Sequence, residues 1–174
     1  MEISFELTQT IAKPPDEVFA FISDFSNMVY WNYYIQSVER ISTGNIMAGS
    51  LFKMTRPRDV KVYKIIELTA PQKMVLELQS PPSVHQLIFT LEKSGTNTVL
   101  SYRWRINADG YPLVRFMPGF LQRLLLFIPR QIILQKTRPA VEENFKKLKE
   151  LLENGKTTLQ DGRTVFYPAL HSLS

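Results

Sequence analysis

Two polar side chains in strand-like parts of this sequence share a face with apolar residues, and there they can meet a bound ligand. His85 is the only histidine outside the last residues, because His171 stands near the end of the chain. An imidazole beside a ligand can act as general acid or base near neutral pH. Arg56 ends an alternating segment, and its guanidinium can hold a carboxylate, phosphate or enolate oxygen through two parallel hydrogen bonds. The sequence therefore offers proton transfer and anion binding as candidate chemistry.

Each of these side chains also has a purely structural interpretation. His85 follows the Pro81-Pro82 turn and can be a partly solvated residue at a strand end. Arg56 can be a solvated strand-end arginine. Three aromatic residues can form ring walls with a polar tip, or can be ordinary core residues: Tyr34, Tyr102 and Trp104. The sequence leaves both interpretations open, since no partner for the histidine is visible in it.

Several classes of protein are disfavoured by what the sequence lacks. It contains no cysteine and only two histidines. Thiol catalysis is therefore excluded, and we expect no metal site. No phosphate-binding loop, dinucleotide fingerprint or nucleophile elbow is present, so we expect no cofactor. The net charge of +5 makes nucleic-acid binding a candidate function. However, the strand faces that carry aromatic residues are expected to point into the protein, so we expect no nucleic-acid partner.

The elements that must position these residues begin with a strand. Apolar residues alternate with polar ones from Ile3 to Ile11, which is the period of a half-buried strand. Pro14 and Pro15, followed by Asp16 and Glu17, are typical of the start of a helix. Asp24 can cap a second short helix that ends near Tyr30-Trp31.

Six further strands are predicted, separated by short turns rich in Gly, Pro, Asn and Asp. They are Tyr34–Ser42, Ser50–Arg56, Val60–Leu68, Lys73–Gln79, Val84–Lys93 and Thr98–Asn107. Connections this short indicate antiparallel neighbours, because a parallel crossover needs a dozen or more residues. Alternation places the following residues on one face: Phe52, Met54 and Arg56; Met74, Leu76 and Leu78; His85, Leu87, Phe89 and Leu91; Leu100, Tyr102, Trp104 and Ile106.

A long helical region is predicted from Met117 to Gly155, with its clearest helical periodicity over Ala140–Glu153. Its apolar stripe would lie against the sheet, and Gly155 would close it at the C′ position. The stripe is Val141, Phe145, Leu148 and Leu152. We expect ion pairs Glu142–Lys146 and Glu143–Lys147 on the opposite face. Pro139 should kink or break the helix.

The positive charge is concentrated in the segment Leu113–Arg138, which contains no acidic residue. Its cations are Arg115, Arg123, Arg130, Lys136 and Arg138. Cations on an apolar helical stretch favour peripheral contact with an anionic membrane, or form the solvated face of a core helix. The two arginines inside the apolar run make it a poor membrane span. No signal peptide is visible after Met1, so we expect a cytoplasmic protein, either free or bound peripherally to a membrane.

The chain resembles the START-like superfamily, also called Bet v 1-like or SRPBCC, and within it the polyketide cyclase/dehydrase and lipid-transport group. The residues that carry the resemblance are Ala12 to Phe19, Ser23-Asp24-Phe25, Trp31, Gly49-Ser50, Gly95-Thr96 and Phe145 to Leu152. The resemblance implies an α+β helix-grip fold, in which a seven-stranded antiparallel sheet wraps around a long C-terminal helix and two short helices follow strand 1. It covers a ligand-binding domain at residues 1–154. The C-terminal tail at 155–174 has no counterpart in the family, and its residues indicate either a small hairpin around Asp161-Gly162 or a loose tail.

The resemblance also implies a mostly apolar cavity between the sheet and the helix. The residues that we expect to bind a ligand are Tyr34, Phe52, Met54, Arg56, Leu76, His85, Leu87, Phe89, Tyr102 and Trp104. Two functions fit such a cavity. One is binding or transport of a hydrophobic small molecule, such as a lipid, quinone or polyketide-like compound. The other is a polyketide cyclase/dehydratase that acts by orientation and by acid/base groups. The apolar inward faces favour the binder.

Overall fold

The computed structural model describes residues 2–79, 84–107, 118, 121, 131 and 133–168, and its centre is one seven-stranded sheet. The strand order is β1-β7-β6-β5-β4-β3-β2, and all neighbours are antiparallel. The strands are β1 (Glu2–Ile11), β2 (Ser37–Arg40), β3 (Leu51–Thr55), β4 (Val60–Thr69), β5 (Lys73–Leu78), β6 (Val84–Ser94) and β7 (Asn97–Asn107). The predicted meander is confirmed, and β1 joins it beside the last strand.

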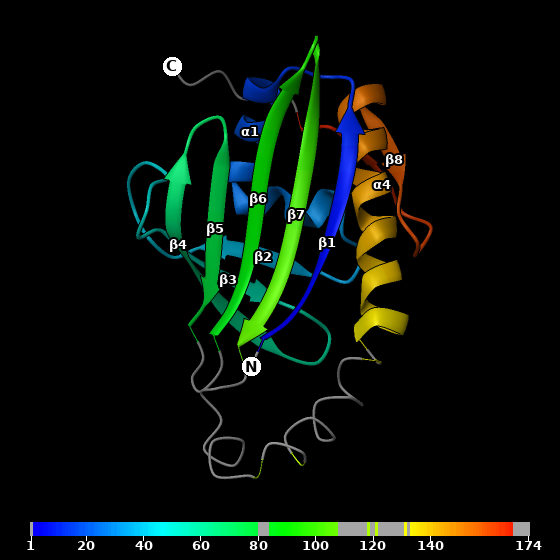
Figure 1. The fold of residues 1–174 in the computed structure, drawn as a ribbon. Helices are drawn as coiled ribbons and strands as arrows, with labels where there is room; N and C mark the ends of the chain where they lie inside the picture. Colours follow the sequence, from blue (N-terminus) through cyan, green and yellow to red (C-terminus); the bar gives the residue numbers. More distant parts are fainter. Residues whose placement is uncertain are drawn as a thin grey trace.

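The helices lie on one side of the sheet (Figure 1). They are α1 (Pro15–Ser23), the 3-10 helix η1 (Phe25–Tyr30) and α4 (Arg138–Asn154), with a π-helical turn η3 (Ile133–Thr137) directly before α4. Figure 1 shows α4 running alongside β1, while α1 and η1 lie behind the middle strands. This is the helix-grip arrangement that the sequence predicts.

The two short helices begin where the sequence places their signals. Pro14 precedes α1 with extended backbone, and Pro15 occupies its first turn together with Asp16 and Glu17. Asp24 then caps η1, because its Oδ1 accepts a hydrogen bond of 3.0 Å from the backbone N–H of Ser26. The chain thus turns before α1 and again before η1, which brings this segment onto the sheet.

The apolar stripe of α4 packs inward as predicted. Phe145, Leu148 and Leu152 are buried, and Val141 is half-buried against the same core. Pro139 lies in the first turn of α4, where its missing N–H breaks no hydrogen bond. Gly155 ends the helix with a left-handed φ of 71°. The start predicted at Met117 lies outside the described residues.

The ion pairs on the outer face of α4 differ partly from the prediction. Lys147 pairs with Glu143 as expected, at 3.8 Å. Glu142 pairs with Arg138 instead of Lys146, at 3.0 Å, and Lys146 pairs with Glu143. The prediction of a Glu142–Lys146 pair is therefore wrong. Arg138 lies one turn before Glu142 and competes for the same carboxylate.

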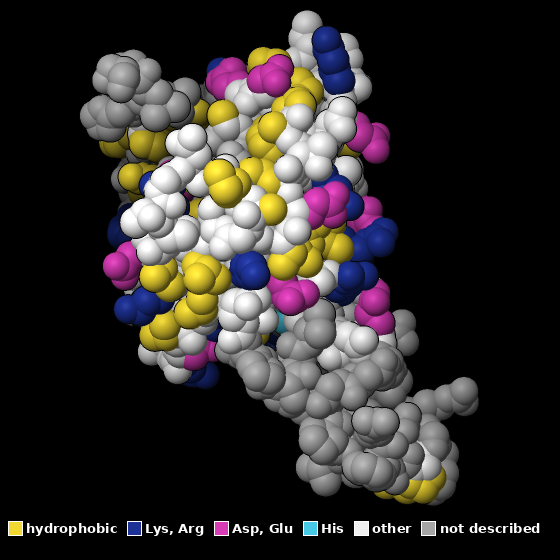
Figure 2. Space-filling model, turned by 90° about the vertical axis from the view of Figure 1, so that its left-hand side faces the viewer, with side chains coloured by type: hydrophobic (Ala, Val, Ile, Leu, Met, Phe, Trp, Pro, Cys, Tyr) yellow, Lys and Arg dark blue, Asp and Glu magenta, His cyan; other side chains and the backbone are white. Residues whose placement is uncertain are grey.

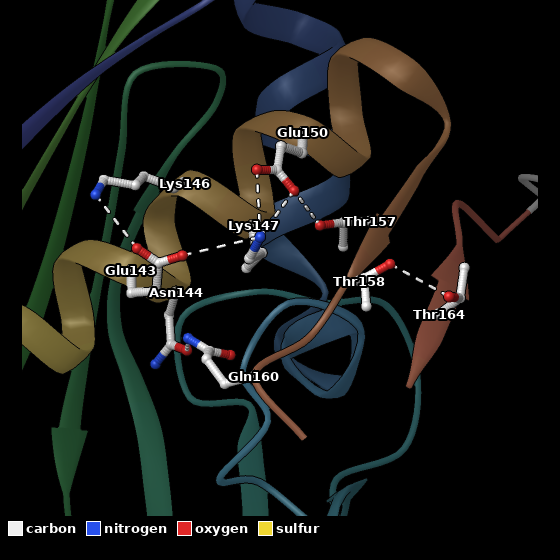
Figure 3. A network of polar contacts seen from close by, with 9 residues as sticks. All are labelled: Glu143, Asn144, Lys146, Lys147, Glu150, Thr157, Thr158, Gln160 and Thr164. Atoms are coloured by element: carbon white, nitrogen blue, oxygen red, sulfur yellow. Dashed lines mark hydrogen bonds and ion pairs between the residues drawn. The ribbon is translucent and has the colours of Figure 1, made fainter. Parts of the chain in front are cut away.

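The residues after α4 form a small hairpin, which decides between the two alternatives left open by the sequence. Strand β8 (Lys156–Thr158) pairs with β9 (Thr164–Phe166) across a turn that contains Gly162 at φ 86°. Figure 3 shows that Thr157 reaches back to Glu150 of α4, to which its hydroxyl donates a hydrogen bond of 2.5 Å. The ring of Tyr167 stacks on Phe21 with centroids 5.1 Å apart. The hairpin and the residue that follows it therefore pack against α4 and α1.

The core fills the space between the concave face of the sheet and the helices. Its largest fully buried side chains include Phe21, Phe25, Phe52, Phe89 and Met74. Phe145 of α4 makes ring contacts with Trp31, Phe89 and Tyr102, at centroid distances of 5.4, 6.4 and 4.9 Å. These aromatic contacts hold α4 against both the sheet and the short helices.

The surface in Figure 2 carries charged side chains of both signs, with hydrophobic side chains in small groups between them. Such a mixed surface is ordinary for a folded domain. In the described part of the chain, no helix has the length and apolar character needed to cross a membrane.

Candidate functional site

A cavity of about 390 Å³ lies between the concave face of the sheet and the first turns of α4. One wall comes from β3, β4, β6 and β7, another from η1 and the segment that follows it, and a third from η3 and α4. A volume of this size lies within the range of sites for small organic ligands. The lining residues are Met28, Asn32, Tyr33, Tyr34, Ile35, Met54, Arg56, Tyr63, His85, Leu87, Tyr102, Trp104, Lys136, Thr137, Ala140, Val141 and Asn144.

Most of the residues expected to bind a ligand line this cavity. They are Tyr34, Met54, Arg56, His85, Leu87, Tyr102 and Trp104. The alternation of β6 and β7 explains the grouping, because His85 pairs with Ile106 and Leu87 with Trp104 across the two strands. Tyr34 reaches the cavity from a turn rather than from the strand that was expected to begin there. Strand β2 starts only at Ser37, and the backbone N–H of Tyr34 donates to the side chain of Asn32.

The remaining three expected residues do not line the cavity. Phe52, Leu76 and Phe89 are 0%, 0% and 1% exposed, and they pack in the core cluster. Each lies on the predicted inward face, but deeper along its strand than the residues at the cavity. Alternation identifies which face a side chain occupies and not how far along the face the cavity extends.

His85 is buried rather than partly solvated at a strand end. Its side chain is 8% exposed, and it contacts the rings of Tyr63 and Trp104 at 5.9 and 5.1 Å. Burial, together with the positive charges of Lys61 and Arg56, lowers the pKa of His85 to about 4. Among the described residues, Nε2 has no hydrogen-bond partner. At neutral pH the cavity wall therefore contains a neutral imidazole.

Two of the four tyrosines that line the same cavity are buried. Tyr63 of β4 is 3% exposed and Tyr102 of β7 is 4% exposed. Burial raises the pKa of both hydroxyl groups above the ordinary value, so both remain protonated at neutral pH. A protonated phenol can donate a hydrogen bond to an oxygen of a ligand. The cavity thus combines apolar walls with a few polar groups.

Arg56 is already engaged by a carboxylate. Its Nε and Nη2 donate to the two oxygens of Asp59 in a bidentate pair, and its guanidinium lies 5.8 Å from the centre of the Tyr34 ring. The hydrogen bonds from Arg56 hold the pKa of the Asp59 carboxyl below its usual range. Part of the guanidinium is thus used within the turn, because Asp59 lies three residues after Arg56, and its remaining N–H groups stay available to a ligand.

Three polar residues near the cavity were missed by the sequence analysis. Tyr63 and Lys61 lie on β4, whose inward face was not assigned, although the alternation of Lys61, Tyr63 and Ile65 gives it directly. Asn144 lines the cavity from α4 and is 5% exposed. It lies one residue before Phe145, so the stripe of apolar residues already indicated its side of the helix.

Two of the further hollows among the described residues lie away from this cavity. One, of about 570 Å³, lies among Pro14, Pro15, Pro71 and neighbouring residues at the turn end of β6. The other lies on the outer face of the sheet, where Glu6 pairs with Arg103. Neither is lined by α4, and the buried Gln86 in the wall of the second is already bonded to Glu77 and Arg105. The described residues contain no cluster of three side chains suited to hold a metal ion.

Comparisons with known proteins agree with this architecture. The sequence profile of the family described as polyketide cyclase / dehydrase and lipid transport matches residues 2–153. The sequence matches no curated protein.

Solved structures show the same fold at low sequence identity. A polyketide cyclase-like protein from Corynebacterium glutamicum is 16% identical, with a TM-score of 0.58 over 87% of this chain and 92% of that one. The protein Ara h 8.0201 is 16% identical, with a TM-score of 0.60 over 87% and 98%. The di-domain ARO/CYC protein StfQ of the steffimycin biosynthetic pathway is 13% identical, with a TM-score of 0.63 over 88% of this chain and 52% of that one.

Proposed function

Because the chain belongs to the polyketide cyclase/dehydrase and lipid transport family of the START-like (SRPBCC) superfamily, we propose that it binds or carries a hydrophobic small molecule in the cavity between the sheet and α4. The observation that carries this proposal is the wall chemistry of that cavity. Met54, Leu87, Trp104 and Val141 supply apolar surface, and only a few polar groups interrupt it. A lipid, quinone or polyketide-like compound has this distribution of apolar and polar surface.

The state of His85 supports binding over acid–base catalysis. A general base is most effective when its pKa lies near the working pH. The pKa of His85 is lowered to about 4, and the charged groups that lower it, Lys61 and Arg56, are both positive. In the described part of the chain no carboxylate orients the imidazole. His85 is therefore a neutral hydrogen-bonding group in the wall rather than a strong base.

A polyketide cyclase/dehydratase remains the second candidate, because a specific observation favours it. His85, Tyr63, Tyr102 and Asn144 bring several buried polar groups to one cavity. Such groups can orient a flexible substrate and stabilise a developing oxyanion without a strong base. Turnover of a poly-β-carbonyl substrate that is lost in Tyr63→Phe or Tyr102→Phe, while binding persists, would favour this candidate.

Binding in the cavity can be tested with a fluorescent apolar probe and a variant that fills the site. Ala140 of α4 lines the cavity and is exposed, so Ala140→Trp should block the site with little cost to folding. Lys146→Trp on the exposed face of the same helix is the matched control. We expect wild type and the control to bind the probe and a long-chain ligand to displace it, while Ala140→Trp binds at least tenfold more weakly. Equal binding by both variants would contradict the proposed site.

We also propose that the segment Leu113–Arg138 contacts an anionic membrane. The support is its sequence, in which five cations without an acid are interleaved with apolar residues. Most of this segment lies outside the described residues. Within it, Lys136 is exposed and lines the cavity, so one described cation of the segment stands beside the ligand site.

A further inference from the structure

Lys61 of β4 is a half-buried lysine beside the ligand cavity. Tyr63 and Ile65 lie two and four residues after Lys61 in β4, and both are buried on the concave face of the sheet. A period of two places Lys61 on this concave face as well. In the sheet it pairs with Met54 of β3, which lines the cavity. Its ammonium group therefore belongs to the cavity side of the sheet and not to the outer surface.

No described residue supplies an acidic partner in contact with Lys61. The nearest charges that act on it are Arg56, which is positive, and Asp59, which is already held by Arg56. Burial, with a contribution from the charge of Arg56, lowers the pKa of Lys61 below its ordinary value. A cation removed from water without a counter-ion is unfavourable, so an anion brought in from outside would be stabilised here.

Arg56 has hydrogen-bonding capacity left beside this lysine. A guanidinium has five N–H donors, and the pair with Asp59 uses only Nε and Nη2. The local charges are two cations, Arg56 and Lys61, against one acid, Asp59. One unit of positive charge thus remains uncompensated among these three residues, beside a cavity whose wall also holds the cation Lys136 and several neutral polar side chains.

The neighbouring imidazole adds a polar group at the same place. His85 lines the cavity, and its buried Nε2 has no partner among the described residues. The charges of Lys61 and Arg56 both act on it, which places all three groups within electrostatic reach of one another. Beyond them, Leu87 and Trp104 continue the wall as apolar surface. The site therefore has a cationic end and an apolar body.

We propose that the ligand is an amphiphile with an acidic end, a carboxylate or a phosphate monoester, and that Lys61 and Arg56 bind this acidic group while the apolar part lies against Leu87 and Trp104. This inference rests on the proposed function, because it names the chemistry of the ligand in the same cavity. It predicts selectivity between molecules that differ only in the charge of the end group.

A matched ligand pair and a matched variant pair test the inference. The ligands are a long-chain fatty acid and the primary alcohol of the same length, each used to displace an apolar probe. Lys61→Met removes the cation and keeps a long apolar side chain. Lys64→Met is the control, because Lys64 lies three residues further along β4 on the exposed face. Wild type should bind the acid more tightly than the alcohol.

The variants should show whether the charge of Lys61 or the shape of its side chain matters for binding. Lys61→Met should lower the affinity for the fatty acid about tenfold or more, as expected for the loss of a charge-assisted hydrogen bond. It should change the affinity for the alcohol by less than about twofold. Lys64→Met should change neither ligand. The inference would be overturned if Lys61→Met lost equal affinity for the acid and the alcohol, or lost no affinity for the acid. If neither ligand displaces the probe from wild type, the proposed function itself fails, and the two failures are thus distinguishable.

A third arm separates an amphiphile site from a site for a free anion. A long-chain alkyl phosphate and inorganic phosphate are compared with the fatty acid. We expect the alkyl phosphate to bind like the fatty acid and inorganic phosphate to compete only weakly, since it buries no apolar surface. Inorganic phosphate that competes as strongly as the alkyl phosphate would overturn the inference in favour of a simple anion site.

The position of the acidic group can be read from the imidazole of His85. In a His171→Gln background, His85 is the only histidine, and its titration can be followed by NMR. A bound carboxylate between Lys61 and Arg56 should raise the pKa of His85 from about 4, and the alcohol should leave it unchanged. Lys61→Met alone should also raise it, because one positive charge is removed. A titration unaffected by the fatty acid would place the acidic group elsewhere.

Discussion

The side-chain amide of Gln160 donates a hydrogen bond of 3.2 Å from Nε2 to Oδ1 of Asn144 (Figure 3). Gln160 belongs to the hairpin turn, and Asn144 lines the ligand cavity from α4. Oδ1 of Asn144 accepts from the hairpin, and its NH2 remains available as a donor. The hairpin thus orients one polar side chain of the cavity wall.

The first prediction concerns this contact. Gln160→Met should remove the orienting hydrogen bond and keep the size of the side chain. The free energy of unfolding should fall by about 1 kcal/mol, the usual contribution of one hydrogen bond. Ligand affinity should fall as well, because the Asn144 amide is free to turn. Urea unfolding and probe displacement measure the two effects.

A control in the same hairpin separates orientation from general loosening. Thr158→Val removes the hydroxyl contact of Thr158 with Thr164, which measures 3.2 Å and lies away from the cavity. This variant should leave ligand affinity unchanged. If it weakens binding as much as Gln160→Met does, the hairpin acts through stability alone and not through Asn144.

The second prediction concerns the pH dependence of stability. The folded pKa of His85, about 4, lies below its ordinary value of 6.5. Between these pH values the unfolded chain binds the proton and the folded chain does not, so stability falls as the pH falls through this window. The loss is complete below about pH 4 and amounts to about 3 kcal/mol at 1.36 kcal/mol per pKa unit.

His85→Gln isolates this contribution from the carboxylates that also titrate in acid. Free energies of unfolding are measured for wild type and variant in urea between pH 7 and pH 4. The difference between the two proteins should change by about 3 kcal/mol across this range, with wild type losing more. Curves that stay parallel would show that the imidazole is solvated or already protonated in the folded protein.

The third prediction concerns the grip of α4 on the sheet. Phe145→Ala should lower the free energy of unfolding by roughly 3–5 kcal/mol, the usual range for a buried aromatic ring. The ring contacts of Phe145 with Trp31 and Tyr102 would both be lost. Lys146→Ala, on the exposed side of the helix, should cost less than about 0.5 kcal/mol. A loss below about 1 kcal/mol for Phe145→Ala would show that this ring is not part of the core.

The fourth prediction concerns the basic segment Leu113–Arg138. Wild type should sediment with anionic vesicles at low salt and be released at high salt. Each cation near the surface contributes about 1 kcal/mol, and salt screens the attraction. Simultaneous replacement of Arg115, Arg123 and Arg130 by Gln should abolish sedimentation. Wild type that stays in the supernatant at low salt, or a triple variant that sediments equally, would remove the membrane proposal.

The architecture could be predicted from the sequence because its signals are local and repeated. Alternation identified the strands, and short turns identified their antiparallel order. Gly155 and the stripe that includes Phe145 and Leu148 identified the last helix. The ion pairs along the helix were less predictable. Glu142 can reach Arg138 or Lys146 at the same i,i+4 spacing, and it pairs with Arg138 although the acid-first order favours Lys146.

The site was predictable only in part, because a cavity depends on three-dimensional depth and on charge neighbours. Alternation placed His85 and Tyr102 on the right face but also included Leu76, which lies deeper in the core. The burial of His85 and the pairing of Arg56 with Asp59 follow from tertiary packing, which no spacing rule provides.

The central claim is that the cavity between the sheet and α4 holds a hydrophobic small molecule. Native mass spectrometry of the protein purified from its own host tests this most directly, with wild type beside Ala140→Trp. We predict a one-to-one adduct on wild type that dissociates on activation and is absent from the filled variant. Wild type observed only at its bare mass, together with a failure to bind any apolar probe or long-chain ligand, would contradict the claim.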